Sequence, residues 1–126
     1  ISVGPLEESE YSRMTITVIG DIKLAEQVSK QLNKLIDVIE VSHLIRNKSV
    51  TRELALIRIN AENSKDRSDI MSYTDVFRGR VVDVTPTNIM IEITGAPDKI
   101  NAFIEIISDF KIEELARTGM TALPRG

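Results

Sequence analysis

The sequence of 126 residues contains no cysteine, no tryptophan and only one histidine. Without cysteine the chain can form no disulfide, offer no thiol nucleophile and supply no thiolate ligand to a metal. Aromatic residues make up 4% of the chain, which leaves little material for the stacking platforms that bind single-stranded nucleic acid. These absences exclude disulfide-stapled folds, thiol enzymes and thiolate metal centres.

Clustered positive charge and long apolar runs are scarce as well. The 16 basic residues are outnumbered by 19 acidic ones, for a net charge of −3, whereas nucleic-acid binding depends on clustered Lys and Arg. No apolar run approaches the roughly 20 residues of a membrane span, and the early Glu7, Glu8 and Glu10 are not typical of a signal peptide. We therefore expect no nucleic-acid or membrane partner and a cytoplasmic location, with an organellar matrix as the alternative.

The second half of the chain alternates between strand and helix patterns. These patterns predict strands at 54–59, 80–84, 89–94 and 112–115, helices at about 64–77 and 100–107, and a tail at 119–126. Ser64 is a candidate cap for the first of these helices, and Gly79 is placed to end it. The order strand-helix-strand-strand-helix-strand is ferredoxin-like, an antiparallel sheet with both helices on one face.

The first half carries part of the same pattern. It predicts strands at 1–3, 14–19 and 38–44, a helix from Lys23 to about Leu35, and a polar connector at 46–51. An internal repeat supports this prediction, because Val18 and Ile93 stand 75 positions apart, each shortly before a glycine. At the same offset the helix positions also match, with Val28, Leu32 and Leu35 falling on Phe103, Ile107 and Phe110.

We therefore expect an α+β fold of two tandem ferredoxin-like modules, at 1–46 and 47–126. The first module has no counterpart of the opening strand and helix, so we expect roughly 30 further residues before Ile1 in the whole protein. Copies commonly pair to cover open sheet edges, which predicts a homodimer. The apolar helix faces are expected to form core: Val28, Leu32 and Leu35 in the first module, and Ile100, Phe103 and Ile107 in the second.

Residues suited to catalysis or metal binding are sparse. The single His43 lies in a strand-like run, where a surface position is more typical than a general base. No serine stands in a Gly-x-Ser-x-Gly setting, and no glycine-rich phosphate loop is present. Glu7, Glu8 and Glu10 indicate a solvated loop, with a weak site for a hard cation as the alternative. We predict neither a catalytic residue nor a metal.

Two groups of basic residues allow two interpretations. Arg78, Arg80 and Arg117 form one group, and Arg46, Lys48 and Arg52 form the other. A solvated face is the simpler interpretation. The alternative is a docking surface for acidic parts of a partner protein, for which we select Arg52, Arg78 and Arg80.

Seven segments carry a family likeness that runs nearly from end to end. They are 1–4 (ISVG), 12–15 (SRMT), 31–38 (QLNKLIDV), 51–57 (TRELALI), 77–84 (FRGRVVDV), 91–95 (IEITG) and 114–119 (ELARTG). In this order they resemble the small subunits of acetolactate synthase, which are built from ACT domains. The sequence departs from that family in having no opening strand and helix.

The resemblance implies a non-catalytic regulatory subunit with no cofactor of its own. Such subunits bind the thiamine-diphosphate-dependent catalytic subunit, raise its activity and confer feedback inhibition by valine or a related branched-chain amino acid. In the family the effector sits between the first ACT domains of two chains, mainly on a loop that this sequence does not contain. Ile1 and Ser2 would lie just after the second-strand contacts, so they mark only the edge of an effector site.

Two other classes of function remain open from the sequence. An amino-acid-sensing module of a transcription regulator also uses ACT-like domains, but it would need a DNA-binding element. A small enzyme on a ferredoxin-like fold would need convergent titratable groups, and one histidine without cysteine supplies few. Fold alone does not decide among these classes. The regulatory-subunit interpretation is therefore preferred because of the end-to-end resemblance.

Overall fold

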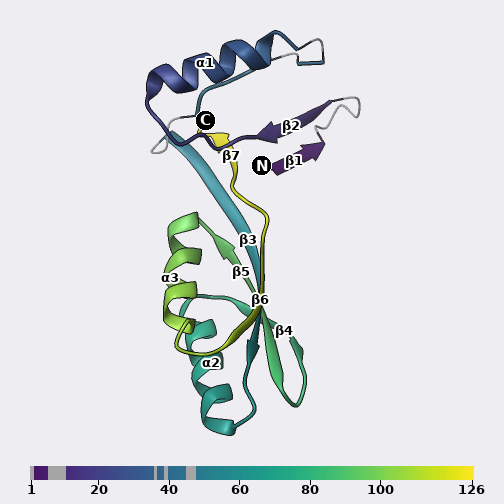
Figure 1. Ribbon diagram of the computed structural model, residues 1–126, viewed down its shortest axis with the longest axis vertical. Helices are drawn as coiled ribbons and strands as arrows, with labels where there is room; N and C mark the ends of the chain where they lie inside the picture. Colours follow the sequence, from purple (N-terminus) through teal and green to yellow (C-terminus); the bar gives the residue numbers. More distant parts are fainter. Residues whose placement is uncertain (1, 6–10, 36, 39, 45–47) are drawn as a thin grey trace.

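The computed structural model describes residues 2–5, 11–35, 37, 38, 40–44 and 48–126. Figure 1 shows how the helices and strands of these residues are arranged. In chain order they are β1 Ser2–Pro5, β2 Ser12–Thr15, α1 Ile22–Asn33, β3 Ser49–Asn60, α2 Ser64–Val76, β4 Arg80–Val84, β5 Asn88–Gly95, α3 Pro97–Ile107, β6 Ile112–Arg117 and β7 Thr121–Pro124. No helix in the described part of the chain is long and apolar enough to span a membrane.

The C-terminal unit has the predicted ferredoxin-like order. Its strands run antiparallel in the order β4-β5-β3-β6, and α2 and α3 lie on the same side of this sheet (Figure 1). Alternate residues of β3, namely Ala55, Ile57 and Ile59, are fully buried, because side chains alternate between the two faces of a strand. The helices therefore cover the face that carries Ala55, Ile57 and Ile59. The opposite face of the sheet carries the alternating positions of β3, such as Leu56 and Arg58.

The core of this unit is one apolar cluster between sheet and helices. Phe103 of α3 packs edge to face against Phe77, with ring centroids 5.3 Å apart and ring planes at 69°. The predicted core positions on α3 are confirmed as buried, together with their partners on the sheet and α2. The buried cluster consists of Ala55, Ile57, Ile59, Ala61, Ile70, Ile89, Ile91, Ile93, Ile100, Phe103 and Ile107.

Local capping explains where the helices begin. Asn63 caps α2, since its side-chain oxygen accepts a hydrogen bond of 2.8 Å from the backbone N–H of Asp66. The expected cap, Ser64, is instead the first helical residue. Asp21 caps α1 in the same way, accepting from the N–H of Leu24 at 2.9 Å. Pro97 begins α3, where a missing backbone N–H costs nothing.

The N-terminal unit keeps the helix of the repeat, but its described residues form no buried core. Its helix α1 begins at Ile22, 75 positions before Pro97 of α3, as the repeat predicts. However, no residue of α1 is buried, and Leu35 is 56% exposed, so the prediction of a core at Val28, Leu32 and Leu35 is wrong for this structure. The reason is that, among the described residues, the sheet of this unit has just the two strands β1 and β2, whereas α3 has four strands and α2 to pack against.

One strand prediction in this unit is wrong, and another is displaced along the sequence. Residues 38 and 40–44 form no strand, although 38–44 was expected to be one. In the C-terminal unit the corresponding β6 pairs with the first strand, β3, whereas no described strand pairs with residues 38 and 40–44. The strand expected at 14–19 is β2 Ser12–Thr15, which ends where its pairing with β1 ends.

A two-stranded arm, formed by residues 49–52 of β3 and by β7, extends from the C-terminal unit. Ser49 pairs with Pro124 and Arg52 pairs with Thr121, so part of the expected connector and part of the expected tail are strand. At the base of the arm, Thr118 donates its N–H to the carbonyl of Leu54 at 3.0 Å. The arm reaches the end of the molecule that holds α1 and β1-β2 (Figure 1).

Candidate functional site

The residues expected at the edge of an effector site lie at the start of the chain. Ser2 begins β1 and pairs with Thr15 of β2, whereas Ile1 lies outside the described residues. The acidic residues Glu7, Glu8 and Glu10, together with Arg46, also lie outside them. The structure therefore places one expected effector residue, at the first position of a strand that pairs with β2.

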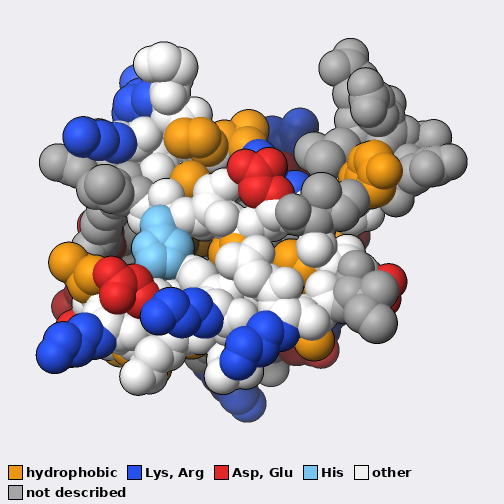
Figure 2. Space-filling model, turned by 90° about the horizontal axis from the view of Figure 1, so that it is seen from above, with side chains coloured by type: hydrophobic (Ala, Val, Ile, Leu, Met, Phe, Trp, Pro, Cys, Tyr) orange, Lys and Arg blue, Asp and Glu red, His pale blue; other side chains and the backbone are white. Residues whose placement is uncertain are grey.

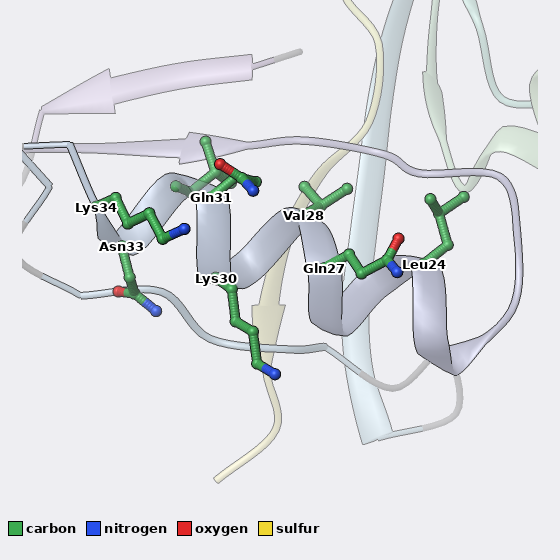
Figure 3. A pocket seen from close by; sticks show the side chains of 8 residues that line it. Leu24, Gln27, Val28, Lys30, Gln31, Asn33 and Lys34 are labelled. Carbon is green, nitrogen blue, oxygen red and sulfur yellow. The ribbon is translucent and has the colours of Figure 1, made fainter.

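A groove runs along α1 in the N-terminal unit. Its volume is about 730 Å³, and its lining comes from α1 and the residue that ends it. In Figure 3, Leu24, Val28 and Gln31 point toward the strands, whereas Lys30 and Asn33 point away from them. Because a single helix supplies the lining, the groove can receive another apolar element but does not enclose a small molecule. The lining residues are Leu24, Gln27, Val28, Lys30, Gln31, Leu32, Asn33 and Lys34.

The single histidine lies at the surface beside α1. His43 Nε2 is hydrogen-bonded to the Ser29 hydroxyl, and this bond ties residues 40–44 to the helix. Figure 2 shows the histidine exposed at the surface near both acidic and basic side chains, with apolar side chains also open to solvent at this end of the molecule. Among the described residues, no group of three or more His, Asp or Glu side chains is placed to hold a metal ion.

The three arginines selected as docking residues lie in different settings. Arg80 on β4 pairs with Glu92 on β5, with its Nη2 3.3 Å from both carboxylate oxygens. Arg78 precedes β4 in a left-handed backbone conformation, with φ of 56°, and its side chain is exposed. Arg52 lies on the arm and donates from Nη1 to the carbonyl of Thr51 at 2.7 Å. These contacts do not join the three residues into one cluster.

The outer face of the C-terminal sheet is a surface that the sequence prediction did not identify. On this face Leu56 is 38% exposed, and Met90 is partly exposed. A shallow hollow of about 190 Å³ lies beside them, lined also by Ala116. The sequence already indicated this surface, because Leu56 and Met90 are apolar residues at the strand positions that alternate with the buried ones.

Charged residues lie beside this apolar centre in two neighbouring rows across the sheet. Arg58 forms an ion pair with Glu114 of β6, and Arg80 forms one with Glu92. Each row runs from β4 to β6 through paired residues. The first row holds Arg80, Glu92, Leu56 and Ala116, and the second holds Asp83, Met90, Arg58 and Glu114.

Comparison with known proteins gives a consistent family. Residues 52–126 match the model described as "Small subunit of acetolactate synthase", and residues 1–40 match the model described as "AHAS small subunit-like ACT domain". The "Probable acetolactate synthase small subunit" of Methanothermobacter thermautotrophicus is 49% identical over 126 residues, which are 100% of this chain and 75% of that protein. The acetolactate synthase small subunit of Aquifex aeolicus is 50% identical over 99% of this chain and 65% of its own length.

A solved structure agrees with these sequence matches. The acetolactate synthase small subunit from Thermotoga maritima superposes with a TM-score of 0.89 at 38% sequence identity. The match covers 99% of this chain and 78% of that structure. Since the likeness holds in both units and over nearly the whole sequence, the chain belongs to the family of acetolactate synthase small subunits.

Proposed function

We propose that this chain regulates acetolactate synthase. It binds the catalytic subunit, raises the rate of acetolactate formation, and makes that rate sensitive to inhibition by valine or a related branched-chain amino acid. The observation that carries the proposal is the match of both units, at 1–40 and 52–126, to models of the acetolactate synthase small subunit.

In this proposal the chain has no catalytic role of its own. The chemistry belongs to the catalytic subunit and its thiamine diphosphate. In support of this division, His43 is exposed and, among the described residues, is hydrogen-bonded to the Ser29 hydroxyl, whereas a general base needs a pocket and a partner that orients it. The cysteine-free composition suits a reducing compartment, so we place the protein in the cytoplasm.

The effector is proposed to bind where the N-terminal units of two chains meet, with residues 1–46 as one unit and 47–126 as the other. Within the described residues β1 pairs only with β2, which leaves an edge whose N–H and C=O groups can pair with a second chain. Ser2 is the first residue of this edge strand, and Ile1 precedes it in the sequence. An effector shared by two chains would bias the arrangement of the dimer, which is how a small ligand can control a distant partner.

For contact with the catalytic subunit we propose Arg52, Arg78 and Arg80. Arg78 is the strongest candidate, because its side chain is exposed and its backbone conformation fixes the turn that presents it. Arg80 would exchange its exposed pair with Glu92 for an acidic group of the partner, and such exposed pairs contribute only about 0.2–1 kcal/mol. The double change Arg78→Glu and Arg80→Glu should therefore weaken activation without unfolding the chain.

The experiment measures acetolactate formation by the matching catalytic subunit alone, with this chain, and with this chain plus valine. A rate increase that valine reverses is expected. The double arginine variant should need a higher concentration for the same activation, whereas Lys65→Glu, which changes an exposed lysine of α2, should behave like the unmodified chain. If the unmodified chain leaves the rate unchanged, the proposed regulation is wrong. If the two variants titrate alike, only the proposed docking surface is wrong.

A further inference from the structure

The junction between the arm and the C-terminal sheet is built differently on its two strands. β3 runs through the junction without interruption, and its buried residues keep to one set of alternate positions along its length. The neighbouring strand is interrupted between β6 and β7. From the pair Ala55–Arg117 to the pair Arg52–Thr121, three steps along β3 correspond to four steps along the neighbour. One strand is therefore continuous at the junction, and the other carries one extra residue.

The extra residue forms a bulge at Thr118 and Gly119. The φ of Gly119 is 78°, in the left-handed region that glycine adopts without strain. A glycine in this conformation is typical of a β-bulge, which bends the strand that contains it. The Thr118 hydroxyl accepts a hydrogen bond from the N–H of Leu54 at 3.1 Å and donates one to the carbonyl of Gly119 at 2.7 Å. These bonds give the bend a defined geometry.

A cluster of three polar side chains fastens the elements beside this bend. Arg117, the last residue of β6, donates from Nε to Oε1 of Glu53 at 2.7 Å and from Nη1 to Oδ1 of Asn101 at 2.7 Å. Glu53 belongs to β3, and its side chain is 7% exposed; Asn101 belongs to α3. A buried carboxylate is strongly unfavourable without such a partner. The cluster therefore opposes movement of the arm relative to the sheet and to α3.

The junction lies between the two regions to which the proposed function gives different tasks. The arm reaches the end of the molecule that holds α1 and β1-β2 (Figure 1), where the effector is proposed to bind. Arg78 and Arg80, proposed to contact the catalytic subunit, belong to the C-terminal unit. β3 has 12 residues and is about 40 Å long, because a strand rises about 3.3 Å per residue. It transmits a tilt from one end to the other only if the junction does not yield.

We propose that the Gly119 bulge and the cluster of Glu53, Arg117 and Asn101 form a rigid elbow. The elbow sets the angle between the N-terminal and C-terminal units, and the response to the effector depends on that angle. The three side chains are positioning residues, since they act through the direction of the arm and bind neither the effector nor the catalytic subunit. The dependence of the effector response rests on the proposed function, whereas the fixed angle does not.

The first test measures the distance between the two units in the full chain of 126 residues. Because the chain has no cysteine, spin labels can be attached at Ile22→Cys, 76% exposed at the start of α1, and at Val76→Cys, 77% exposed at the end of α2. Pulsed electron paramagnetic resonance then gives the distribution of distances between the labels. An excess of unlabelled chain ensures that both labels of each measured pair belong to one chain.

In this labelled chain Glu53→Ala removes the carboxylate of the elbow. The matched control is Glu114→Gln, which alters a pair between the same two strands, β3 and β6, whose carboxylate side chain is 71% exposed. Circular dichroism verifies that each variant is folded. Asn101→Ala is the second variant; it removes the bond between α3 and Arg117 and leaves the Glu53–Arg117 pair in place.

We expect one narrow distribution for the labelled chain and for Glu114→Gln, and a broader or shifted distribution for Glu53→Ala. A cluster that only adds stability would leave the distance in the folded chain unchanged, so a Glu53→Ala distribution equal to that of the control overturns the elbow. A broad distribution in the chain without these changes also overturns it. If Glu53→Ala does not fold, the comparison of Asn101→Ala with the control decides in the same way.

The second test measures acetolactate formation by the matching catalytic subunit with Asn101→Ala and increasing valine. We expect unchanged stimulation, and a rise of about fivefold in the valine concentration that gives half inhibition, at the low end of typical couplings between sites. Unchanged inhibition in a variant whose distance distribution has broadened overturns the dependence of the effector response on the elbow. If the chain without substitutions neither stimulates nor responds to valine, the proposed function is wrong, and the distance measurement still decides the elbow.

Discussion

Replacing Glu53 with glutamine should destabilise the C-terminal unit through one buried ion pair. The Glu53 side chain is 7% exposed, and that of Arg117 is 30% exposed. Arg117 donates from Nε to Oε1 of Glu53 at 2.7 Å and from Nη1 to Oδ1 of Asn101 at 2.7 Å. These bonds join β3, β6 and α3 at the base of the arm.

The expected loss follows from the burial of the two partners. Removing one partner of a fully buried ion pair costs about 3–5 kcal/mol, because the other charge is left uncompensated. Here Arg117 is partly exposed and keeps its bond to Asn101, and the glutamine oxygen can still accept one hydrogen bond. We therefore expect the free energy of unfolding to fall by about 1.5–3 kcal/mol for Glu53→Gln.

Urea unfolding followed by far-ultraviolet circular dichroism measures this loss, since the chain has no tryptophan to report by fluorescence. The matched control is Glu114→Gln. Glu114 pairs with Arg58 across the same two strands, but its side chain is 71% exposed, so a loss below about 1 kcal/mol is expected. Equal losses for the two variants would refute the argument that burial sets the strength of the Glu53–Arg117 pair.

Two further predictions concern the core and a helix cap. Phe103→Ala should lower the free energy of unfolding by about 3–5 kcal/mol, because the ring is fully buried and packs on Phe77; the same urea titration measures this, and a loss below that of Glu114→Gln would contradict it. Asn63→Ala should cost about 1 kcal/mol, since the Asp66 N–H loses its side-chain acceptor. Faster hydrogen exchange confined to the first turn of α2 would identify the cap as the cause, and unchanged exchange there would argue against it.

The fold of the C-terminal unit was predictable because each apolar strand or helix face in it packs against another element of the same chain. Strand 54–59 has apolar residues on alternate positions, and the helix face of Ile100, Phe103 and Ile107 is the one that covers them. The pattern in the N-terminal unit was read correctly as a helix but wrongly as core. Periodicity reports which face is apolar, whereas burial depends on whether another element covers that face.

The arm and its strand β7 could not be predicted from the hydrophobic pattern of the sequence. Residues 121–124 contain alanine and proline and have no strand pattern of their own. They become a strand because the turn around Gly119, with φ of 78°, directs the chain back along residues 49–52 of β3. A pairing formed this way depends on chain direction after β6, which hydrophobic periodicity does not encode.

The candidate surfaces were predictable in part. Arginine at position 80 was recognised as exposed and charged, but its pairing with Glu92 depends on the register of β4 with β5, which shifts at a bulge between Val81 and Asp83. The apolar centre at Leu56 and Met90 was overlooked for a different reason. Isolated apolar residues at solvent-facing strand positions are common. Leu56 and Met90 become neighbours only because β3 and β5 are adjacent in the sheet.

The most direct test of the regulatory assignment is sedimentation velocity of this chain mixed with its matching catalytic subunit. We expect the two proteins to sediment together as one faster species in a fixed ratio, while the chain alone forms no acetolactate. Independent sedimentation of the two proteins at concentrations where the catalytic subunit is active would contradict it.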